Sequence, residues 1–381
     1  MKVHHVLYTH KNYGGAESFI DVIMKFSKHS HTIGFTENTS EEAKSEPGFL
    51  KFYFDFKSYI QTLDSSKYNI IHPHFFIPAY FSQEKGLKTI CSSHCLLSKE
   101  FELGKYDATT REERQELETA SNFFKFFEEI LYRRIKKLLV HSQYHKIELQ
   151  SLGCDPKELN CPVDLEQFNP NIDQQKSRKL IDVPDKYTLL FLGRATYLKG
   201  LHVLLDSFKR IPKTEDIQLL IIGDFYKNTN GQLSYNHCLR GKFTDKYPKY
   251  FDIINDNIIA KGPIDRDSIH LYFSASDAIV CPSLYESAGI VNLEAMACGK
   301  PVIASKTSGI PFIVQDGKTG FLFEPGNSGE LRKKILKLKK NPHLASFLGK
   351  NCRKYVVRHH DGSNIVKELD KLYDLVEENE K

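Results

Sequence analysis

The chain has 381 residues, of which 40% are apolar and 27% charged, with a formal net charge of +5. This length exceeds what one hydrophobic core usually serves, so two domains are expected, and the composition excludes a disordered chain. The small basic excess does not argue for a nucleic-acid partner, and no stretch approaches the roughly 18 to 20 apolar residues of a membrane span.

The N-terminal sequence predicts a first strand and no signal peptide, because its apolar run is broken by His and Lys and lacks a small-residue cleavage site. The eight cysteines are scattered, and several lie within apolar runs. This usage predicts reduced thiols and a cytoplasmic protein.

Short apolar runs alternate with helical patterns along the chain. Strands that are apolar throughout and separated by helices predict parallel sheets that are covered on both faces. The predicted strands are 3–9, 31–36, 69–73, 88–93, 138–142, 188–193, 218–223, 258–262, 278–282 and 301–305, and the predicted helices include 16–28, 123–137, 201–211 and 291–298.

The alternation breaks once, over residues 153–186, where four prolines and no strong period indicate an interdomain linker. On each side the chain begins with a strand, a glycine-bearing loop and a helix, as in HHVLYTHKNYGGAE and TLLFLGRATYLKG. This unit receives phosphate at its helix N-terminus. We therefore expect an α/β fold of two Rossmann-like, doubly wound domains, 1–165 and 176–358, facing a central cleft, with helix 362–381 packing back on the first.

The second domain opens with FLGRATYLKGLHVLLDSF, which runs from a strand into a helix and has Arg194 and Lys199 in the loop. Two cations beside a helix N-terminus suit a diphosphate and the charge that builds on it as a bond breaks. The alternative is a pair of solvated surface charges. In the first domain GGAE, with Gly15, follows a strand in the same way, and a plain tight turn is the alternative there.

The stretch YESAGIVNLEAMACGKPVIAS contains two acids, Glu286 and Glu294, around a predicted helix start. This pattern places Glu286 and the free N–H groups of Gly289 to Val291 at a strand's carboxyl end, with Glu294 about one turn further along. A carboxylate can accept two hydroxyl hydrogen bonds, which suits a ribose. A paired-carboxylate hydrolase is a competing interpretation, as are capping or surface glutamates.

Together these segments resemble the retaining nucleotide-sugar glycosyltransferases of family 4, within the group 1 glycosyltransferases, which have the GT-B fold. GGAE, GRATYLKG, the paired-glutamate segment and GKTGFLFEPGN all match, along nearly the whole chain. The resemblance implies that Arg194 and Lys199 bind the donor diphosphate, Glu286 the sugar and Glu294 the ribose. The other donor-binding positions that it implies are Gly15, Gly193, Gly223, Ala288, Gly289, Ile290 and Val291.

The first domain carries His72, His74 and His94 after strands. The family usually has a pocket histidine at the end of the second of these strands, so the resemblance assigns His94 to the reacting centre, and a satisfied core histidine is the alternative. Cys91, His94 and Cys95 also suggest metal, but CSSHC has no second ligand pair at zinc spacing, so we expect none.

Two departures from the family concern the donor pocket. Phe225 stands where the family often has a second glycine after Gly223 and Asp224, which leaves the base-binding wall undefined. Ala288 replaces a larger residue and would reshape the sugar pocket. Separately, residues 123–139 combine an aromatic face with a basic end, which predicts a helix packed on the first sheet or docking on a membrane surface.

The expected activity is transfer of a sugar from a UDP- or GDP-sugar to a hydroxyl acceptor with retention, without a metal or other cofactor. The acceptor would be a saccharide, a lipid-linked molecule or a small molecule, bordered by the charged stretch 99–118, in the synthesis of a polysaccharide, cell envelope or glycoconjugate. The alternatives are a sugar-nucleotide 2-epimerase and an inactive nucleotide-sugar-binding protein.

Overall fold

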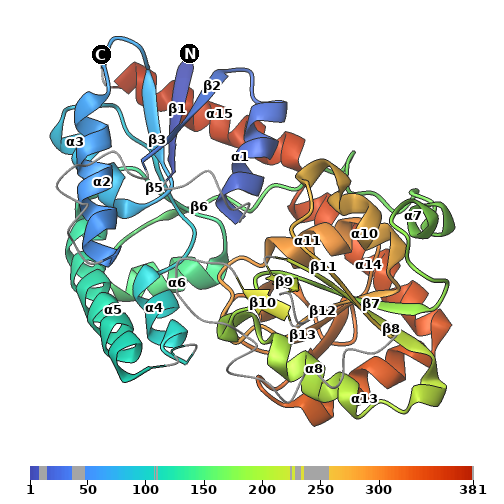
Figure 1. The fold of residues 1–381 in the computed structure, drawn as a ribbon. Coiled ribbons are helices and arrows are strands. Elements are labelled where there is room, and N and C mark those ends of the chain that lie inside the picture. Colours follow the sequence, from blue (N-terminus) through green and yellow to red (C-terminus); the bar gives the residue numbers. More distant parts are fainter. Residues whose placement is uncertain are drawn as a thin grey trace. The chain divides into compact units, whose positions relative to one another are not determined.

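The computed structural model describes residues 1–7, 15–36, 48–106, 108, 110–223, 225–227, 233–235 and 257–379 (Figure 1). The chain divides into two compact units. The first comprises Met1–Lys99, Thr119–Asp164 and Asp361–Lys381, and the second Glu100–Glu118 and Leu165–His360. The sequence placed 100–118 in the first domain, whereas this segment is grouped with the second unit.

Residues 1–164 contain six strands, six helices and a single 3-10 turn within the described ranges. The elements are β1 (Lys2–Leu7), α1 (Gly15–Phe26), β2 (Ser30–Phe35), α2 (Gly48–Thr62), β3 (Ile70–Pro73), α3 (Phe76–Glu84), β4 (Cys91–Ser93), α4 (Leu97–Gly104), α5 (Arg111–Leu131), η2 (Tyr132–Arg134), β5 (Leu138–Val140), α6 (Gln143–Ser151) and β6 (Lys157–Glu158).

The strands of the first unit run parallel in the order β2-β1-β3 and β4-β5-β6. A parallel bridge between Ile71 and Thr89 joins the two sets of strands. The strand order therefore reverses between β1 and β3. In open sheets of this kind, ligands bind beyond the carboxyl ends of the strands at such a reversal.

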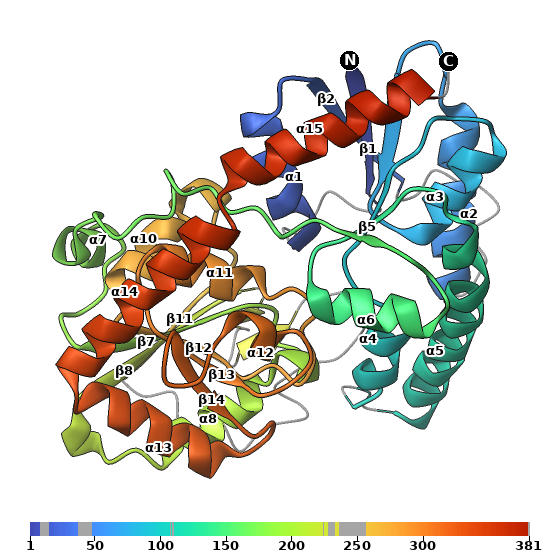
Figure 2. The ribbon, with the colours of Figure 1, turned by 180° about the vertical axis from the view of Figure 1, so that it is seen from behind.

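The last helix, α15 (Gly362–Asn379), belongs to this first unit and packs against α1 (Figure 2). Its Tyr373 is fully buried, and the hydroxyl lies 2.6 Å from Nδ1 of His72 in β3. Asp370 accepts a hydrogen bond from the backbone N–H of Lys28, at 3.0 Å. These contacts fix the helix on β3 and on the segment between α1 and β2, which lie 301 and 342 residues earlier in the sequence.

Residues 165–360 form a second doubly wound unit. Its elements are α7 (Gln174–Leu180), β7 (Tyr187–Leu192), η3 (Tyr197–Lys199), α8 (Leu201–Lys209), η4 (Lys213–Glu215), β8 (Ile217–Ile222), β9 (Phe225–Lys227), β10 (Leu233–Tyr235), β11 (Ile258–Lys261), η6 (Arg266–Ser268), α10 (Ile269–Ala275), β12 (Ala278–Cys281), α11 (Ile290–Ala297), β13 (Val302–Ser305), α12 (Ile310–Ile313), β14 (Gly320–Phe323), α13 (Ser328–Lys339) and α14 (Pro342–His359).

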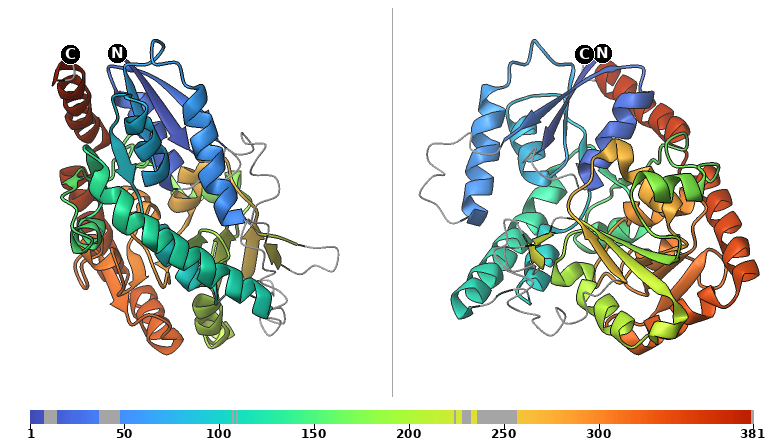
Figure 3. Two further views of the ribbon diagram at one scale, coloured as in Figure 1. Left: turned by 90° about the vertical axis from the view of Figure 1, so that its left-hand side faces the viewer. Right: turned by 45° about the vertical axis from the view of Figure 1, so that its right-hand side comes forward.

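Six of these strands form one parallel sheet in the order β11-β8-β7-β12-β13-β14. In chain order this is 3-2-1-4-5-6, the arrangement of dinucleotide-binding sheets, and it reverses between β7 and β12. Alternate residues such as Leu189 and Phe191 pack with α8 and α13 in the core. Figure 3 shows these strands side by side with helices along them.

All ten predicted strands are confirmed, with each end within three residues of the prediction, among the residues that the structure describes. Four further strands were not predicted: β6, β9, β10 and β14. The predicted helix 123–137 is wrong at both ends, because α5 begins at Arg111 and ends at Leu131, where the 3-10 turn η2 follows. No helix in the described ranges has the length and apolarity needed to cross a bilayer.

The segment 153–186, predicted as an interdomain linker, contains regular structure as well as the boundary between the units. The boundary between the units lies at 164/165, and α7 occupies Gln174–Leu180. The side chain of Asp173 caps this helix by accepting a hydrogen bond from the backbone N–H of Lys176, at 2.6 Å. The helix is only seven residues long, so its period is too short to stand out among the neighbouring prolines.

Candidate active site

Two loops meet at the strand-order reversal of the second unit. One follows β7 and contains Arg194 and Lys199; the other follows β12 and contains Glu286. The backbone N–H of Leu284 donates a hydrogen bond to the carbonyl of Leu198, at 2.6 Å, so the loops are joined directly. The sequence motifs of the two loops, whose Lys199 and Glu286 are 87 residues apart, therefore form one site at the carboxyl edge of the sheet.

An ion pair between Lys199 and Glu286 links the side chains of these loops. Lys199 Nζ lies 2.6 Å from Glu286 Oε2, and the two side chains are 25% and 19% exposed. Burial works to lower the pKa of Lys199, but the charge of Glu286 and its hydrogen bond outweigh it, so this pKa is raised. Lys199 therefore stays a cation in a half-buried place, where a charge interacts more strongly than in water.

Arg194 lies in the bend after β7, close enough for its charge to act on Lys199 in the direction opposite to Glu286. Each cation has a carboxylate nearby: Glu286 beside Lys199, and Glu100, whose Oε1 lies 3.6 Å from Nη2 of Arg194. A polyanion such as a diphosphate would pair with both cations at once.

The start of α11 adds backbone donors to the same edge. Gly289 precedes the helix with φ of 60°, a left-handed conformation that favours glycine. The first N–H groups of the helix, from Ile290 and Val291, have no acceptor within the helix because of its geometry. Ala288, Ile290 and Val291 are all half-buried. The helix predicted over 291–298 is confirmed within one residue at each end, since α11 is Ile290–Ala297.

A glycine also allows the two loops to approach. Gly200 has φ of 66°, and a Cβ there would collide with the backbone carbonyl oxygen of Pro282. Only glycine satisfies both the backbone conformation and this contact. Gly200 therefore holds the Lys199 loop against the loop that carries Glu286.

Glu294 lies one turn inside α11 and is only 3% exposed. Its Oε1 is 2.5 Å from Nη2 of Arg266, which comes from the turn η6 beyond the third strand of the sheet. The guanidinium of Arg266 lies over the ring of Phe168, 5.1 Å from the centroid. Sequence reasoning missed Arg266; the signal was its place just after the strand 258–261.

Two buried hydroxyl groups in these loops have no hydrogen-bond partner within the described part of the chain. They are Thr196 Oγ1 and Ser287 Oγ, one in each loop, and both residues are at most 6% exposed. Buried polar groups are almost always satisfied, by protein, water or ligand. These hydroxyls were not predicted, although both lie within the quoted motifs.

The remaining predicted glycines are backbone features. Gly193 and Gly223 end neighbouring strands, and a Cβ on Gly223 would collide with the carbonyl oxygen of Gly193. Gly15 opens α1 in the first unit. Gly14 and Asp224 lie outside the described residues, as does most of the stretch between Phe225 and Ile258.

His94 lies in the first unit, after β4, and its ring is half-buried. Its Nε2 is 2.9 Å from Nδ1 of His74, and its ring stands edge-on to Phe19 with centroids 5.5 Å apart. Burial holds the pKa of His94 well below its usual range. A neutral imidazole has one donor and one acceptor nitrogen, so it suits a hydroxyl rather than a phosphate.

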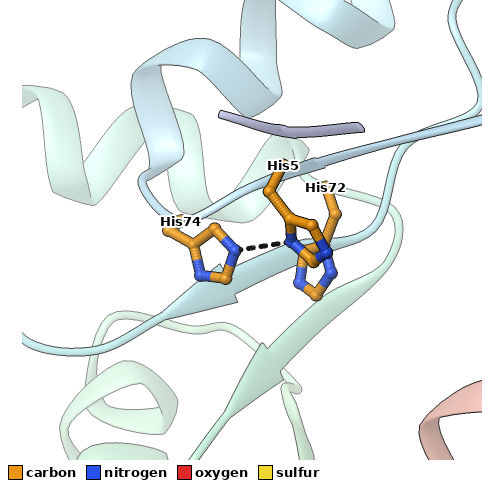
Figure 4. Close-up of side chains that lie close together, drawn as sticks. All are labelled: His5, His72 and His74. Carbon is orange, nitrogen blue, oxygen red and sulfur yellow. Dashed lines mark hydrogen bonds between the residues drawn. The ribbon is translucent and has the colours of Figure 1, made fainter. Parts of the chain in front are cut away.

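One group of three histidines in the described ranges lies close enough together to hold a metal ion: His5, His72 and His74, whose ligand atoms are all within 4.8 Å (Figure 4). However, both nitrogens of every ring already have a partner. His72 contacts Tyr373 and Ser92, at 2.6 and 2.7 Å, while the other two rings contact further histidines. A metal would have to displace a hydrogen bond from each ring.

Comparison with known proteins gives a family match to the second unit. Residues 173–355 match the family model described as glycosyl transferases group 1. A curated relative, D-inositol 3-phosphate glycosyltransferase 2 of Catenulispora acidiphila, is 29% identical over 58% of this chain and 52% of its own length. The chain thus spans about half the length of that relative.

Solved structures match nearly the whole chain. Sucrose-phosphate synthase from Thermosynechococcus elongatus has a TM-score of 0.75 with 21% identity, over 98% of both chains. Anabaena Alr3699/HepE, solved in complex with UDP-glucose, has a TM-score of 0.74 with 18% identity, over 98% of this chain and 99% of that one. These likenesses confirm the expected GT-B fold class.

Proposed function

We propose that the chain is a retaining glycosyltransferase of group 1, on the premise that its residues 173–355 match the family model of the glycosyl transferases group 1. It would move a sugar from a nucleoside diphosphate to a hydroxyl group of an acceptor. The observation that carries this proposal is the ion pair of Lys199 with Glu286, beside the start of α11 and at the strand-order reversal of a six-stranded sheet.

In the proposed complex the diphosphate lies against Arg194, Lys199 and the first N–H groups of α11. The sugar contacts Glu286 and the backbone of 288–291, and the ribose contacts Glu294. The hydroxyls of Thr196 and Ser287 would gain partners from the same ligand. Positive charge and oriented N–H groups would stabilise the diphosphate as it becomes a leaving group.

The proposed reaction proceeds on one face of the sugar. The bond between the anomeric carbon and the diphosphate oxygen breaks, and the acceptor oxygen forms a bond to that carbon on the same face. The acceptor's proton passes to an oxygen of the leaving diphosphate, so no protein nucleophile is needed. Lys199 stabilises the leaving group while remaining a cation, in agreement with its raised pKa.

The donor is proposed to be a UDP- or GDP-sugar, and the complex of Alr3699/HepE with UDP-glucose supports UDP as the first choice. Arg194 and Lys199 would take the place of a metal ion at the diphosphate. The acceptor is a saccharide, a lipid-linked molecule or a small molecule. We further propose a cytoplasmic enzyme of glycoconjugate or polysaccharide synthesis, with 123–139 as the segment that contacts a membrane surface if the acceptor is a lipid.

The test begins with a thermal-shift panel of nucleotide sugars, because a ligand that binds only the native state raises the apparent melting temperature. The donor that shifts it most is then incubated with acceptor mixtures, with and without EDTA, and the anomeric configuration of the product is determined by NMR. Transfer with retention that EDTA does not affect is expected. An inverted product, loss of activity in EDTA, or an epimer formed from donor alone would contradict the proposal.

A further inference from the structure

Four histidines of the first unit form an unbroken chain of ring-to-ring hydrogen bonds. His31 Nδ1 lies 2.9 Å from His5 Nε2, His5 Nδ1 lies 3.0 Å from His74 Nε2, and His74 Nδ1 lies 2.9 Å from His94 Nε2. The middle bond is drawn in Figure 4. The chain begins in β2, crosses β1 and ends beyond β4, at the residue assigned to the reacting centre.

Strand pairing explains why these rings meet. His5 is aligned with Ile33 of β2 and with His72 of β3. Side chains two residues apart share a face of the sheet, so His31 and His74 lie on the same face as His5, each displaced by one pair of residues. The chain therefore runs diagonally across one face of the sheet.

All four rings are neutral at neutral pH. Burial holds the pKa values of His5, His74 and His94 well below the usual range. Burial also lowers the pKa of His31, to about 4, although the charge of Asp370 works in the opposite direction. Each ring thus carries one proton and offers one donor and one acceptor nitrogen.

A chain of four neutral rings can place its protons in only two ways. Each of the three bonds needs one proton, and the fourth proton lies at one end, on Nε2 of His31 or on Nδ1 of His94. The tautomer of one ring therefore determines the tautomers of the other three rings. The tautomer of His94 is therefore coupled to the surroundings of His31.

At the His31 end Asp370 makes the largest charge contribution, ahead of the opposing contributions of His29 and the N-terminal ammonium. Asp370 of α15 is 5% exposed and accepts hydrogen bonds from the hydroxyl of Ser27 and the backbone N–H of Lys28, so it is held in place. Its charge attracts a proton toward the His31 end. His31 Nε2 is buried without a hydrogen-bond partner within the described residues, so electrostatic attraction is what distinguishes the two states there.

We infer that His31, His5 and His74 are positioning residues that hold His94 in one neutral tautomer, with Nε2–H bonded to His74 and Nδ1 free to accept a hydrogen bond from a substrate hydroxyl. This inference deepens the proposed function and rests on it for the identity of the ligand. A sugar or acceptor hydroxyl that donates to Nδ1 would be favoured. A group that can only accept a hydrogen bond would be rejected.

The decisive experiment changes His31, at the end of the histidine chain far from His94. Asp at position 31 can only accept from His5, so His31→Asp should keep the tautomer of His94. Lys can only donate, so His31→Lys should reverse all three bonds and put the proton on Nδ1 of His94. The tautomer is read from ring ¹⁵N shifts in protein labelled at histidine, with the His94 signal assigned by its loss in His94→Gln.

One control separates coupling from general damage. His4→Gln changes a neighbouring buried histidine that bonds to Thr32 and Tyr59 instead. It should leave the His94 tautomer unaltered. In His31→Lys the KM of the ligand that contacts His94 should rise about tenfold, the effect of one hydrogen bond, with kcat nearly unchanged.

The outcomes distinguish this inference from the proposed function. If His94 has the same tautomer in His31→Asp and His31→Lys, the inference is overturned even where glycosyl transfer is observed. If the His94 tautomer changes with residue 31 but no nucleotide-sugar donor reacts, the inference about the histidine chain is supported and the glycosyltransferase assignment is wrong. One tightly bound transition-metal ion per chain, lost in His5→Ala, would replace the hydrogen bonds with coordination and also overturn the inference.

Discussion

The two units place opposite kinds of polar chemistry at equivalent edges of their sheets. Beyond β7, β11 and β12 the second unit collects charges: Arg194, the pair of Lys199 with Glu286, and the buried pair of Arg266 with Glu294. Beyond β3 and β4 the first unit collects neutral imidazoles, ending at His94. Both groups follow the carboxyl ends of parallel strands.

This difference matches two parts of the proposed glycosyl transfer. A leaving diphosphate needs fixed positive charge, which is most effective where water is partly excluded. A hydroxyl needs directed, uncharged hydrogen-bond partners, which a buried imidazole with a lowered pKa provides. Burial therefore has different consequences in the two units. In the second unit the buried charged side chains form ion pairs, whereas in the first unit the buried histidines are neutral.

The largest expected effect is on the charged edge. Lys199→Ala should lower kcat by about 10²- to 10³-fold, since one fixed donor at a developing charge has about that effect. Steady-state kinetics at saturating donor would measure it, with circular dichroism to show an intact fold. Lys209→Ala, at the exposed end of α8, is the matched control and should behave as wild type. A near-normal kcat in Lys199→Ala would remove Lys199 from the reaction.

Arg266→Met breaks the buried ion pair and should lower the free energy of unfolding by about 3 to 5 kcal/mol, because Glu294 then remains charged and unpaired in the interior. Chemical denaturation would measure this loss. The double variant Arg266→Met with Glu294→Met should recover much of it. If the double variant is as unstable as the single one, packing of Arg266 on Phe168 is the dominant contribution.

Gly200→Ala tests how the charged edge is assembled. The collision with Pro282 and the left-handed backbone together should cost about 3 kcal/mol of stability and lower activity by displacing Lys199. Gly317→Ala is the control, since Gly317 has φ of 74° but no atom within 4 Å of an added Cβ. It should cost only about 1 kcal/mol. Equal losses in the two variants would show that the contact with Pro282 is unimportant.

In the first unit burial also favours the neutral form of a carboxyl group. Glu128 accepts hydrogen bonds from the backbone N–H groups of Leu97 and Ser98, at 2.6 and 3.3 Å, yet burial raises its pKa to about 7. Because the folded pKa exceeds the unfolded value of about 4.5, stability from this group is full below pH 4.5 and is lost as the pH rises through 7.

Between pH 5 and 8 the free energy of unfolding of the wild type should therefore fall by about 2 kcal/mol more than that of Glu128→Gln. Urea denaturation of wild type and variant at both pH values measures the difference. Glu129→Gln, one residue further along the same helix, serves as the control. A wild-type dependence that Glu128→Gln leaves unchanged would show that Glu128 is ionised in the folded protein.

Much of the second unit could be predicted from the sequence, because its strands are continuous apolar runs and its loops carry motifs. Arg194, Lys199, Glu286 and the start of α11 lie together as the alternation of strands and helices implied. Arg266 could not be placed, since its pairing with Glu294 depends on which strand lies beside which. The strand order 3-2-1-4-5-6 is a property of the assembled sheet.

The first unit was less predictable for a related reason. The sequence drew attention to His72, His74 and His94, but not to His5 or His31, which lie in ordinary-looking strands. Their connection arises from the register of β1 with β2 and β3. Register is fixed by packing and by turns, so a hydrogen-bonded chain across three strands leaves no pattern along any one of them.

The central claim is that the loop of Lys199 and the start of α11 bind the diphosphate of a nucleotide sugar. Calorimetry with a nucleoside diphosphate and the matching nucleoside, in wild type and Lys199→Ala, tests it most directly. We expect the variant to bind the diphosphate at least tenfold more weakly and the nucleoside unchanged. Equal affinity of wild type and variant for the diphosphate, or an equal loss for the nucleoside, would contradict the claim.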